Sequence, residues 1–361
     1  MKKERLYWID RVKFLACVFI MLAHFQDAVL DACTLPPAAS PLYTALNNFL
    51  APLETGKCWV IVFCILSGFL SCREVRSFRE LAAEGLTRWL RFFLPLLAVN
   101  ALAFVLLRTG RMYHGVYGER FGNSWLLGHY TGHTGARDVL IQSAILGSAF
   151  DGPLWMLRPL FLGNLAVLTV SFLGSRLPEK FRSPLEWAAF GLLLLGGTRS
   201  VSLFYMAVTF SGLLIARTRR AVLSRKWIPA GILVPWLSLY LPQLGESFAF
   251  VHSEFCYFLL GLILVVPFFY SGYAGRPTGR FPLGGVSFWV YVLHFPVELS
   301  LGLGIVLGGL DHFFPAFALA ALTVSAVTVG TGYLLTRTFD RRTGKLVKGI
   351  KERMLGQGVG P

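Results

Sequence analysis

The first apolar stretch of the chain, Trp8 to Phe25, contains residue types that can perform acid–base chemistry. Lys13 and His24 are eleven residues apart, and Asp27 follows His24 by three. Eleven helical steps of about 100° return to nearly the same face, so Lys13 and His24 share one side of a helix, about 16 Å apart along it. A histidine beside a carboxylate can accept a proton from a hydroxyl, which makes His24 a candidate base oriented by Asp27. The structural alternative is that His24 only hydrogen-bonds a neighbouring helix.

A second group of polar residues lies in the apolar segment "YVLHFPVE". Tyr291 and His294 are one helical turn apart, and Glu298 follows at the i+4 position beyond Pro296, which can kink the helix. Ionisable residues at membrane depth are costly and usually face a cavity or one another, which favours a substrate-binding role. The alternative is that Tyr291 and His294 bond to adjacent helices.

The third group lies in "PLWMLRPLF", where Arg158 follows Trp155 by one turn. An arginine inside the outer leaflet can bind an anionic or hydroxyl-rich substrate through two parallel hydrogen bonds. Tryptophan and arginine near a helix end are also ordinary interfacial anchors.

The elements that position these residues must be membrane helices, because 55% of the 361 residues are hydrophobic and the mean hydropathy is +0.60. Apolar runs indicate ten spans, at residues 12–30, 58–72, 91–107, 154–174, 184–197, 199–216, 228–242, 252–270, 285–306 and 313–337. Residues 139–150 are predicted to lie at the membrane–water interface. We therefore expect an all-α, polytopic membrane bundle of about ten transmembrane helices. It forms one domain over residues 1–361, with a core at 8–337 and a basic cytoplasmic tail at 338–361.

The distribution of basic residues orients this bundle and argues against nucleic acid as a partner. With the N-terminus inside, the inner segments hold 27 of the 34 Lys and Arg residues, the outer segments hold 6, and Arg158 lies in a span. This is the positive-inside pattern, so both termini are expected in the cytoplasm and the lipid bilayer is the expected partner of the basic residues.

Cysteine and histidine spacing gives no indication of a metal site. Cys33 and Cys58 are both expected near the outer face, where they can pair if that compartment is oxidising. His129 and His133 lie in the glycine-rich segment "GHYTGHTG", for which a flexible outer loop is the favoured interpretation.

Five motifs occur along the chain in the order "IDRVKFLACVFIMLAHF", "VIVFCILSGFL", "LTRWLRFFLPLL", "GPLWMLRPLF" and "GGVSFWVYVLHFPV". With these motifs the chain resembles the acyltransferase family 3 membrane proteins, and most of all their fucose 4-O-acetylase-related branch. The resemblance runs from about residue 8 to 337. Lys13 occupies the position of the arginine that precedes the family's first histidine by eleven residues. Arg88 and Arg91 match its RxxR element, Ser67 and Gly68 its SGF turn, and Tyr291 with His294 its YLxH motif.

The resemblance implies transfer of acetyl or another short acyl group from cytoplasmic acyl-CoA to a hydroxyl of an extracytoplasmic or lipid-linked glycan. Lys13, Arg88, Arg91 and Ser67 would hold acetyl-CoA or another acyl-CoA on the inner side. His24, oriented by Asp27, would act either as general base on the acceptor hydroxyl or as a transient acyl carrier. Trp155, Arg158, Tyr291, His294 and Glu298 would contact the acceptor. The main alternative is a transporter or flippase for a glycan or anionic solute, which also needs intramembrane charges, although no internal repeat is evident. A membrane scaffold or sensor is the third interpretation.

Overall fold

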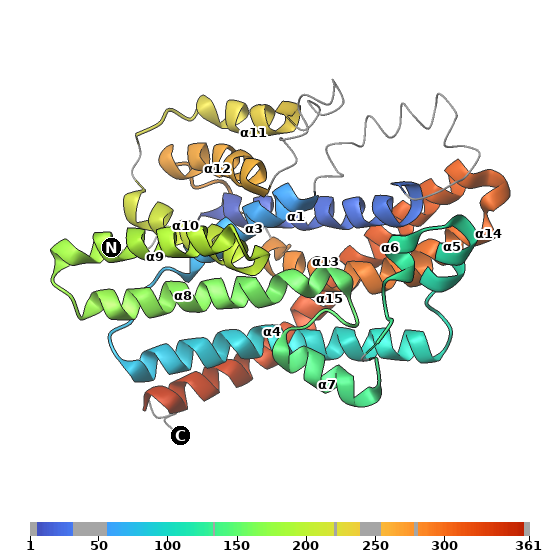
Figure 1. Ribbon diagram of the computed structural model, residues 1–361, viewed down its shortest axis with the longest axis horizontal. Helices are drawn as coiled ribbons and strands as arrows, with labels where there is room; N and C mark the ends of the chain where they lie inside the picture. Colours follow the sequence, from blue (N-terminus) through green and yellow to red (C-terminus); the bar gives the residue numbers. More distant parts are fainter. Residues whose placement is uncertain are drawn as a thin grey trace.

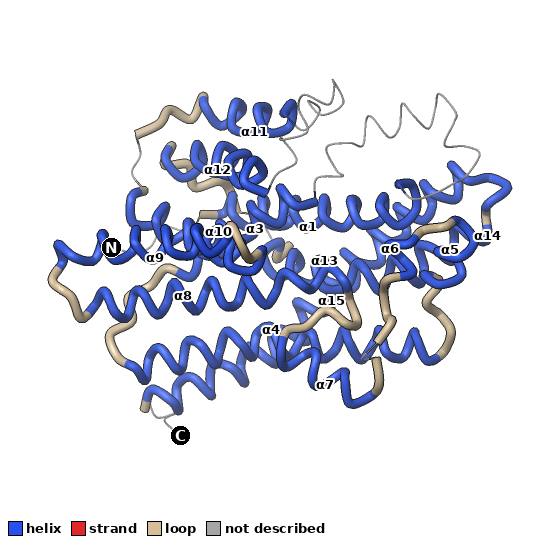
Figure 2. The backbone as a smooth tube through the Cα atoms, in the orientation of Figure 1, coloured by secondary structure: helices blue, strands red, loops and turns tan. Residues whose placement is uncertain are grey.

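The computed structural model describes residues 6–31, 56–132, 134–219, 222–238, 254–277 and 281–356, and this part of the chain contains helices and no strand (Figures 1 and 2). The α-helices are α1 (Tyr7–Gln26), α3 (Gly56–Ser71), α4 (Phe78–Arg108), α5 (His114–Phe121), α6 (Ser124–Leu127), α7 (Ala136–Ile145), α8 (Leu157–Ser175), α9 (Glu179–Gly197), α10 (Val201–Thr218), α11 (Trp227–Ser238), α12 (Glu254–Tyr270), α13 (Leu283–Val297), α14 (Leu303–Gly308) and α15 (Phe313–Leu355). Two π-helical turns, η1 (Asp27–Asp31) and η6 (Glu298–Gly302), extend α1 and α13, and 3₁₀ turns lie at η3 (Gly152–Met156) and η7 (Leu310–His312).

Six helical segments of the described chain are long and apolar enough to cross a membrane. They are Tyr7–Val29, Phe78–Arg108, Gly152–Ser175, Val201–Thr218, Leu283–Gly308 and Leu310–Leu355. Gly56–Ser71, Trp227–Leu237 and Glu254–Tyr270 are shorter apolar helices, and charged residues at the start of α9 leave that helix outside both groups. The all-α membrane bundle is confirmed, whereas the count of ten spans stays a prediction. The predicted interfacial segment overlaps α7, which packs against α4 through an Asn100 Nδ2 to Ser143 Oγ hydrogen bond of 2.9 Å.

Helices α3 and α10 approach so closely that glycine is required on both. A Cβ atom at Gly68 would collide with the backbone of Thr209, and one at Gly212 would collide with the backbone of α3. Ser67 and Gly68 lie inside α3, which ends at Ser71, and not in the turn expected from the SGF motif. The motif serves close helix packing, which small residues permit in membrane proteins.

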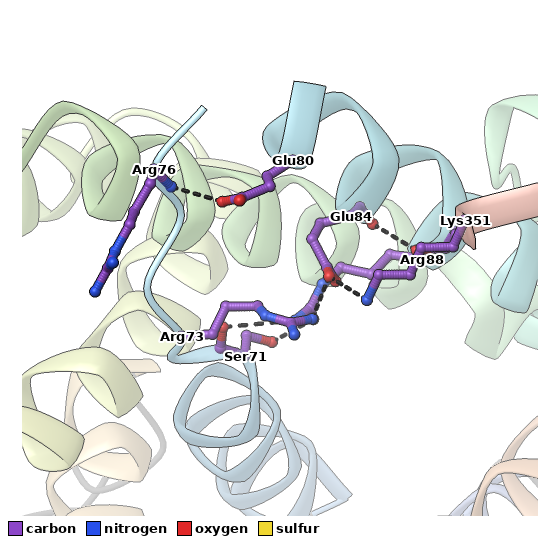
Figure 3. Close-up of polar contacts among 8 residues, drawn as sticks. Ser71, Arg73, Arg76, Glu80, Glu84, Arg88 and Lys351 are labelled. Atoms are coloured by element: carbon purple, nitrogen blue, oxygen red, sulfur yellow. Dashed lines mark hydrogen bonds and ion pairs between the residues drawn. The ribbon is translucent and has the colours of Figure 1, made fainter. Parts of the chain in front are cut away.

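One end of the bundle collects basic residues and is called the basic end here. It contains the 72–77 linker, the turn between α8 and α9, and the last part of α15 (Figure 1). Ser77 begins α4 there, because its hydroxyl accepts a 3.1 Å hydrogen bond from the backbone N–H of Glu80. The Glu80 carboxylate in turn accepts from the backbone N–H of Arg76 at 2.7 Å (Figure 3).

Helix α15 continues without a break far past residue 337. Its 43 residues correspond to roughly 65 Å at 1.5 Å per residue, about twice the thickness of a bilayer core. Beyond residue 337 it packs on α4, where Lys351 and Arg73 both form ion pairs with the buried carboxylate of Glu84 (Figure 3). Arg79 also donates to the carbonyl of Met354. The predicted basic tail is thus helical as far as Leu355 and is attached to the core.

The opposite end, called the distal end, carries α5, α6 and α14 (Figure 1). The π turn η1 widens the end of α1 and frees carbonyls that the α5–α6 segment satisfies. Asn123 Nδ2 donates to the carbonyls of Asp27 at 3.3 Å and Ala28 at 3.1 Å, and the Tyr117 hydroxyl donates to that of Val29 at 3.2 Å. The segment after α4 is therefore fixed over the end of α1.

Candidate active site

Two predicted site residues from distant segments meet at the distal half of the bundle. The rings of His24 on α1 and His294 on α13 stack with centroids 5.5 Å apart and planes 17° apart. Helices α1 and α13 pack along each other, which fixes this pair. His294 is completely buried, whereas the His24 side chain is 22% exposed. His24 is thus the member of the pair that is open to an entering ligand.

Asp27 lies beside His24 but does not hydrogen-bond to it. Asp27 Oδ2 is 3.7 Å from His24 Nδ1, which exceeds hydrogen-bond distance. The cause is local: the helix widens into η1 at Asp27, so the regular i to i+3 geometry expected from the sequence is lost. The carboxylate is close enough to stabilise a protonated His24 electrostatically.

The hydrogen bonding of His294 defines its tautomer. Its Nδ1 lies 3.2 Å from the carbonyl oxygen of Val290, and a carbonyl can only accept, so Nδ1 carries the proton. Nε2 then has a free lone pair, and this buried atom has no hydrogen-bond partner in the described chain. His294 therefore offers an acceptor directly beside His24.

Two buried carboxyl groups lie near this pair. Glu298 and Asp151 are both 0% exposed, and none of their four carboxyl oxygens has a hydrogen-bond partner among the described residues. The two groups interact electrostatically with each other. Burial raises the pKa of the Asp151 carboxyl well above its usual value. Buried polar groups in proteins are nearly always paired, so unpaired ones mark a place where a polar ligand can bind.

Trp125 and His129 cover this site from the distal end, and neither is among the residues expected to bind substrate. Trp125 stacks on His24 with centroids 6.2 Å apart, and His129 packs edge-on against Phe295 at 4.9 Å. A Cβ atom at Gly152 would come within 2.5 Å of the His129 ring, so the ring occupies space that this glycine provides. Burial, with His114 and His24 nearby, lowers the pKa of His129 to about 4.

The sequence contained a signal for His129, because "GHYTGHTG" places a histidine among glycines. The interpretation as a flexible loop is wrong for His129, which is packed in the site. His133 lies outside the described residues.

A cavity of about 450 Å³ opens at the basic end and brings together three of the four residues predicted to bind acyl-CoA. Lys13, Ser67 and Arg91 line it. The ammonium of Lys13 lies 4.8 Å from the centroid of the Phe63 ring, which also lines the cavity. The opposite wall is the part of α15 beyond residue 337, with Asp340, Thr343, Gly344 and Val347.

A chain of aromatic rings connects this cavity with the histidine pair. Phe63 and Leu160 line both the large cavity and a small pocket of about 10 Å³ that also includes Tyr291. The Phe63 and Tyr291 centroids are 6.0 Å apart, and Tyr291 is 6.0 Å from His294. Ring contacts from Phe63 through Tyr291 and His294 thus link the cavity to His24.

Other predicted site residues are engaged elsewhere. Arg88 does not line the cavity, since it donates to the Ser71 hydroxyl at 2.6 Å and so joins α4 to α3 (Figure 3). Tyr291 donates to the carbonyl of Pro153 at 2.5 Å. This hydrogen bond to a neighbouring segment agrees with the structural alternative given above for Tyr291. Trp155 packs on Tyr205 of α10, and Arg158 is exposed, so neither joins the histidine pair.

Among the described residues, no group of His, Cys, Asp and Glu is arranged to hold a metal ion. Cys58 is buried, and Cys33 lies outside the described residues, so their pairing stays a prediction.

Residues 6–337 match the acyltransferase domain of acyltransferase family 3. No curated protein and no solved structure matches the chain. The match includes α1, with Lys13 and His24, and α13, with His294, and it ends just before the part of α15 that closes the basic-end cavity. The chain therefore belongs to acyltransferase family 3 and is an integral membrane acyltransferase.

Proposed function

We propose that this chain transfers an acetyl or other short acyl group from acyl-CoA to a hydroxyl of an extracytoplasmic or lipid-linked glycan. The observation that carries the proposal is a series of ring contacts. They link the cavity lined by Lys13 and Arg91 at the basic end to the stacked rings of His24 and His294 toward the distal end. The transporter and flippase alternative has no comparable support, because the family is one of acyltransferases.

The basic-end cavity offers positive charge and hydroxyl groups suited to part of an acyl-CoA donor. Its volume of about 450 Å³ lies within the range of small-molecule sites. Lys13 and Arg91 supply positive charge for the donor's phosphates, and Ser67 and Thr343 supply hydroxyl groups. Phe63 and Leu160 continue the cavity toward Tyr291, in the direction that a thioester arm would have to take. We place the basic end in the cytoplasm, where acyl-CoA is present, following the positive-inside distribution.

In the proposed reaction, His24 removes the proton of the acceptor hydroxyl while that oxygen attacks the thioester carbonyl carbon. The carbon–sulfur bond breaks, CoA leaves as the thiolate, and the proton on His24 then restores the thiol. Asp27, 3.7 Å away, stabilises the imidazolium, and the free Nε2 of His294 orients the acceptor through a hydrogen bond. Asp151 and Glu298 provide further hydrogen-bonding atoms for a ligand rich in hydroxyl groups. Burial of the site limits hydrolysis of the thioester.

Release of CoA thiol by purified protein given acetyl-CoA and a glycan acceptor tests the function. Arg91→Gln is expected to raise the apparent KM for acetyl-CoA by about 10-fold, because a charge-assisted contact worth about 1.5 kcal/mol is lost. Lys13→Arg should retain donor binding, since the charge is kept.

Arg88→Gln is the matched control, since it removes the same charge one turn away at a residue that bonds to Ser71 and does not line the cavity. We expect it to lower thermal stability with little change in KM. Equal KM values for wild type and Arg91→Gln would place the donor elsewhere.

A further inference from the structure

A second cavity, of about 380 Å³, lies at the basic end and shares no lining residue with the proposed donor cavity. It is enclosed by the 72–77 linker, the end of α8, the start of α9 and the end of α10. Its lining residues are Glu74, Arg76, Ser171, Gly174, Ser175, Arg176, Arg182, Glu186 and Arg217. We call it the arginine cavity. The proposed reaction uses none of these residues.

The charges in the arginine cavity do not cancel. Glu186 is buried and is paired with Arg217, whose Nε lies 3.0 Å from its carboxylate. The exposed Glu74 pairs with Arg76 at 2.7 Å, and in Figure 3 the Arg76 side chain points away from the Glu84 cluster. Four arginines thus face two glutamates in this cavity.

Arg176 and Arg182 form no ion pair in the described part of the chain, although Arg182 interacts electrostatically with Glu74. The Arg176 guanidinium lies 5.2 Å from the Phe172 ring centroid, and Arg182 Nε makes a long 3.4 Å contact with the carbonyl of Leu177. Both guanidinium groups therefore retain N–H donors for an anion. The planar, forked guanidinium matches phosphate oxygens well.

A buried hydroxyl provides independent evidence for a ligand. Ser171 lines the cavity and is only 5% exposed, yet its Oγ has no hydrogen-bond partner in the described chain. A buried hydroxyl without a partner is costly, and a ligand oxygen would satisfy it. One hydroxyl and two guanidinium groups that form no ion pair make a donor set suited to a phosphate group.

The surroundings of the cavity indicate where that phosphate comes from. Three apolar side chains on α8, on α9 and in the turn between them are exposed: Leu173 at 47%, Leu177 at 38% and Phe181 at 50%. They lie where α8, a membrane-length helix, ends. A phosphate bound at this end of α8 would lie close to exposed apolar side chains. A phospholipid has the same arrangement, with its headgroup phosphate next to its acyl chains.

We propose that the arginine cavity is a binding site for the phosphate of an anionic phospholipid headgroup. The site is separate from the donor cavity and does not depend on the proposed reaction. Arg176, Arg182 and Ser171 would hold the phosphate, while Leu173, Leu177 and Phe181 contact the acyl chains.

The test measures thermal unfolding of the purified full chain in phosphatidylcholine micelles with increasing phosphatidylglycerol. We expect phosphatidylglycerol to raise Tm saturably. The double variant Arg176→Gln, Arg182→Gln should require at least about 10-fold more phosphatidylglycerol, because it removes the charged hydrogen-bond donors of the site. Ser171→Ala should show a smaller loss. Lys180→Gln, Lys226→Gln removes two exposed basic charges outside the cavity and should behave as wild type.

Two further arms identify the source of the phosphate. Inorganic phosphate in phosphatidylcholine micelles should give no comparable stabilisation, and acetyl-CoA should bind wild type and the Arg176, Arg182 double variant equally. Full stabilisation by inorganic phosphate would overturn the lipid assignment. A loss of acetyl-CoA binding in the double variant would assign the cavity to the donor instead. If the Arg176, Arg182 double variant and the Lys180, Lys226 control variant responded equally to phosphatidylglycerol, the lipid would be attracted by the general positive charge of the surface. This result would refute the site.

Discussion

Replacing Gly344 with leucine separates the proposed role of the α15 extension in donor binding from its role in stability. Gly344 lines the basic-end cavity, and a Cβ atom there would meet nothing within 4 Å. Leucine is more favourable than glycine inside a helix, so the substitution should raise the free energy of unfolding by about 0.5–1 kcal/mol. The same side chain would enter space that the donor needs, at a cost of about 1–3 kcal/mol. Donor affinity should fall by about 5- to 150-fold, at 1.4 kcal/mol per factor of ten.

Gly349 provides the matched control, because it lies on the same extension, also has open space around it, and does not line the cavity. Isothermal titration of acetyl-CoA and thermal unfolding of the detergent-solubilised protein measure the two effects. Gly349→Leu should gain stability and keep wild-type affinity, whereas Gly344→Leu should gain stability and lose affinity. Unchanged affinity in Gly344→Leu would refute the assignment of α15 as a wall of the donor site.

Two further predictions concern packing and pH. Gly68→Ala should destabilise the chain by about 3 kcal/mol or more in a thermal or denaturant series, because the new methyl group collides with the Thr209 backbone. Gly191→Ala, at a helical glycine with open space, is its control, and equal stability of the two variants would contradict the close approach of α3 and α10. The lowered pKa of His129, about 4 against an ordinary 6.5, means that the unfolded chain binds this proton more readily than the folded one. The stability contribution of His129 is therefore complete above pH 6.5 and is lost as the pH falls from 6.5 toward 4, and His129→Gln should flatten Tm over this range. An identical pH profile for the two proteins would show that His129 is not buried.

The sequence predicted the membrane bundle, and it identified residues that the fold brings to the basic-end cavity and the histidine pair, because these features depend on local patterns. The roles of those residues stay predictions. Apolar runs identified α1, α4, α8, α10, α13 and α15. The spacing of Lys13 and His24 indicated that they lie on one face of α1, and the structure has Lys13 at the basic-end cavity and His24 among the distal rings. Both depend only on helical periodicity, which is readable along one segment.

Features that depend on contacts between segments were not predictable. The stack of His24 on His294 needs the register of α1 against α13, and the role of Asp151 needs the fold of the 109–151 segment. Arg88 and Arg91 look equivalent in the RxxR motif, but their side chains leave α4 in different directions, toward Ser71 and toward the cavity. The π turn at Asp27 has no composition signal, and it changes the geometry of the His24–Asp27 pair.

The proposed role of His24 in acyl transfer is tested most directly by turnover of the His24→Gln variant. Glutamine can keep a hydrogen bond to a neighbour but cannot accept a proton at neutral pH. The assay compares CoA release, with acetyl-CoA and a glycan acceptor, for wild type and the variant at equal amounts of folded protein and with donor binding measured separately. We predict unchanged donor binding with a rate reduced by about 10²-fold or more, the scale of a lost general base. Wild-type turnover in His24→Gln would contradict the proposed reaction.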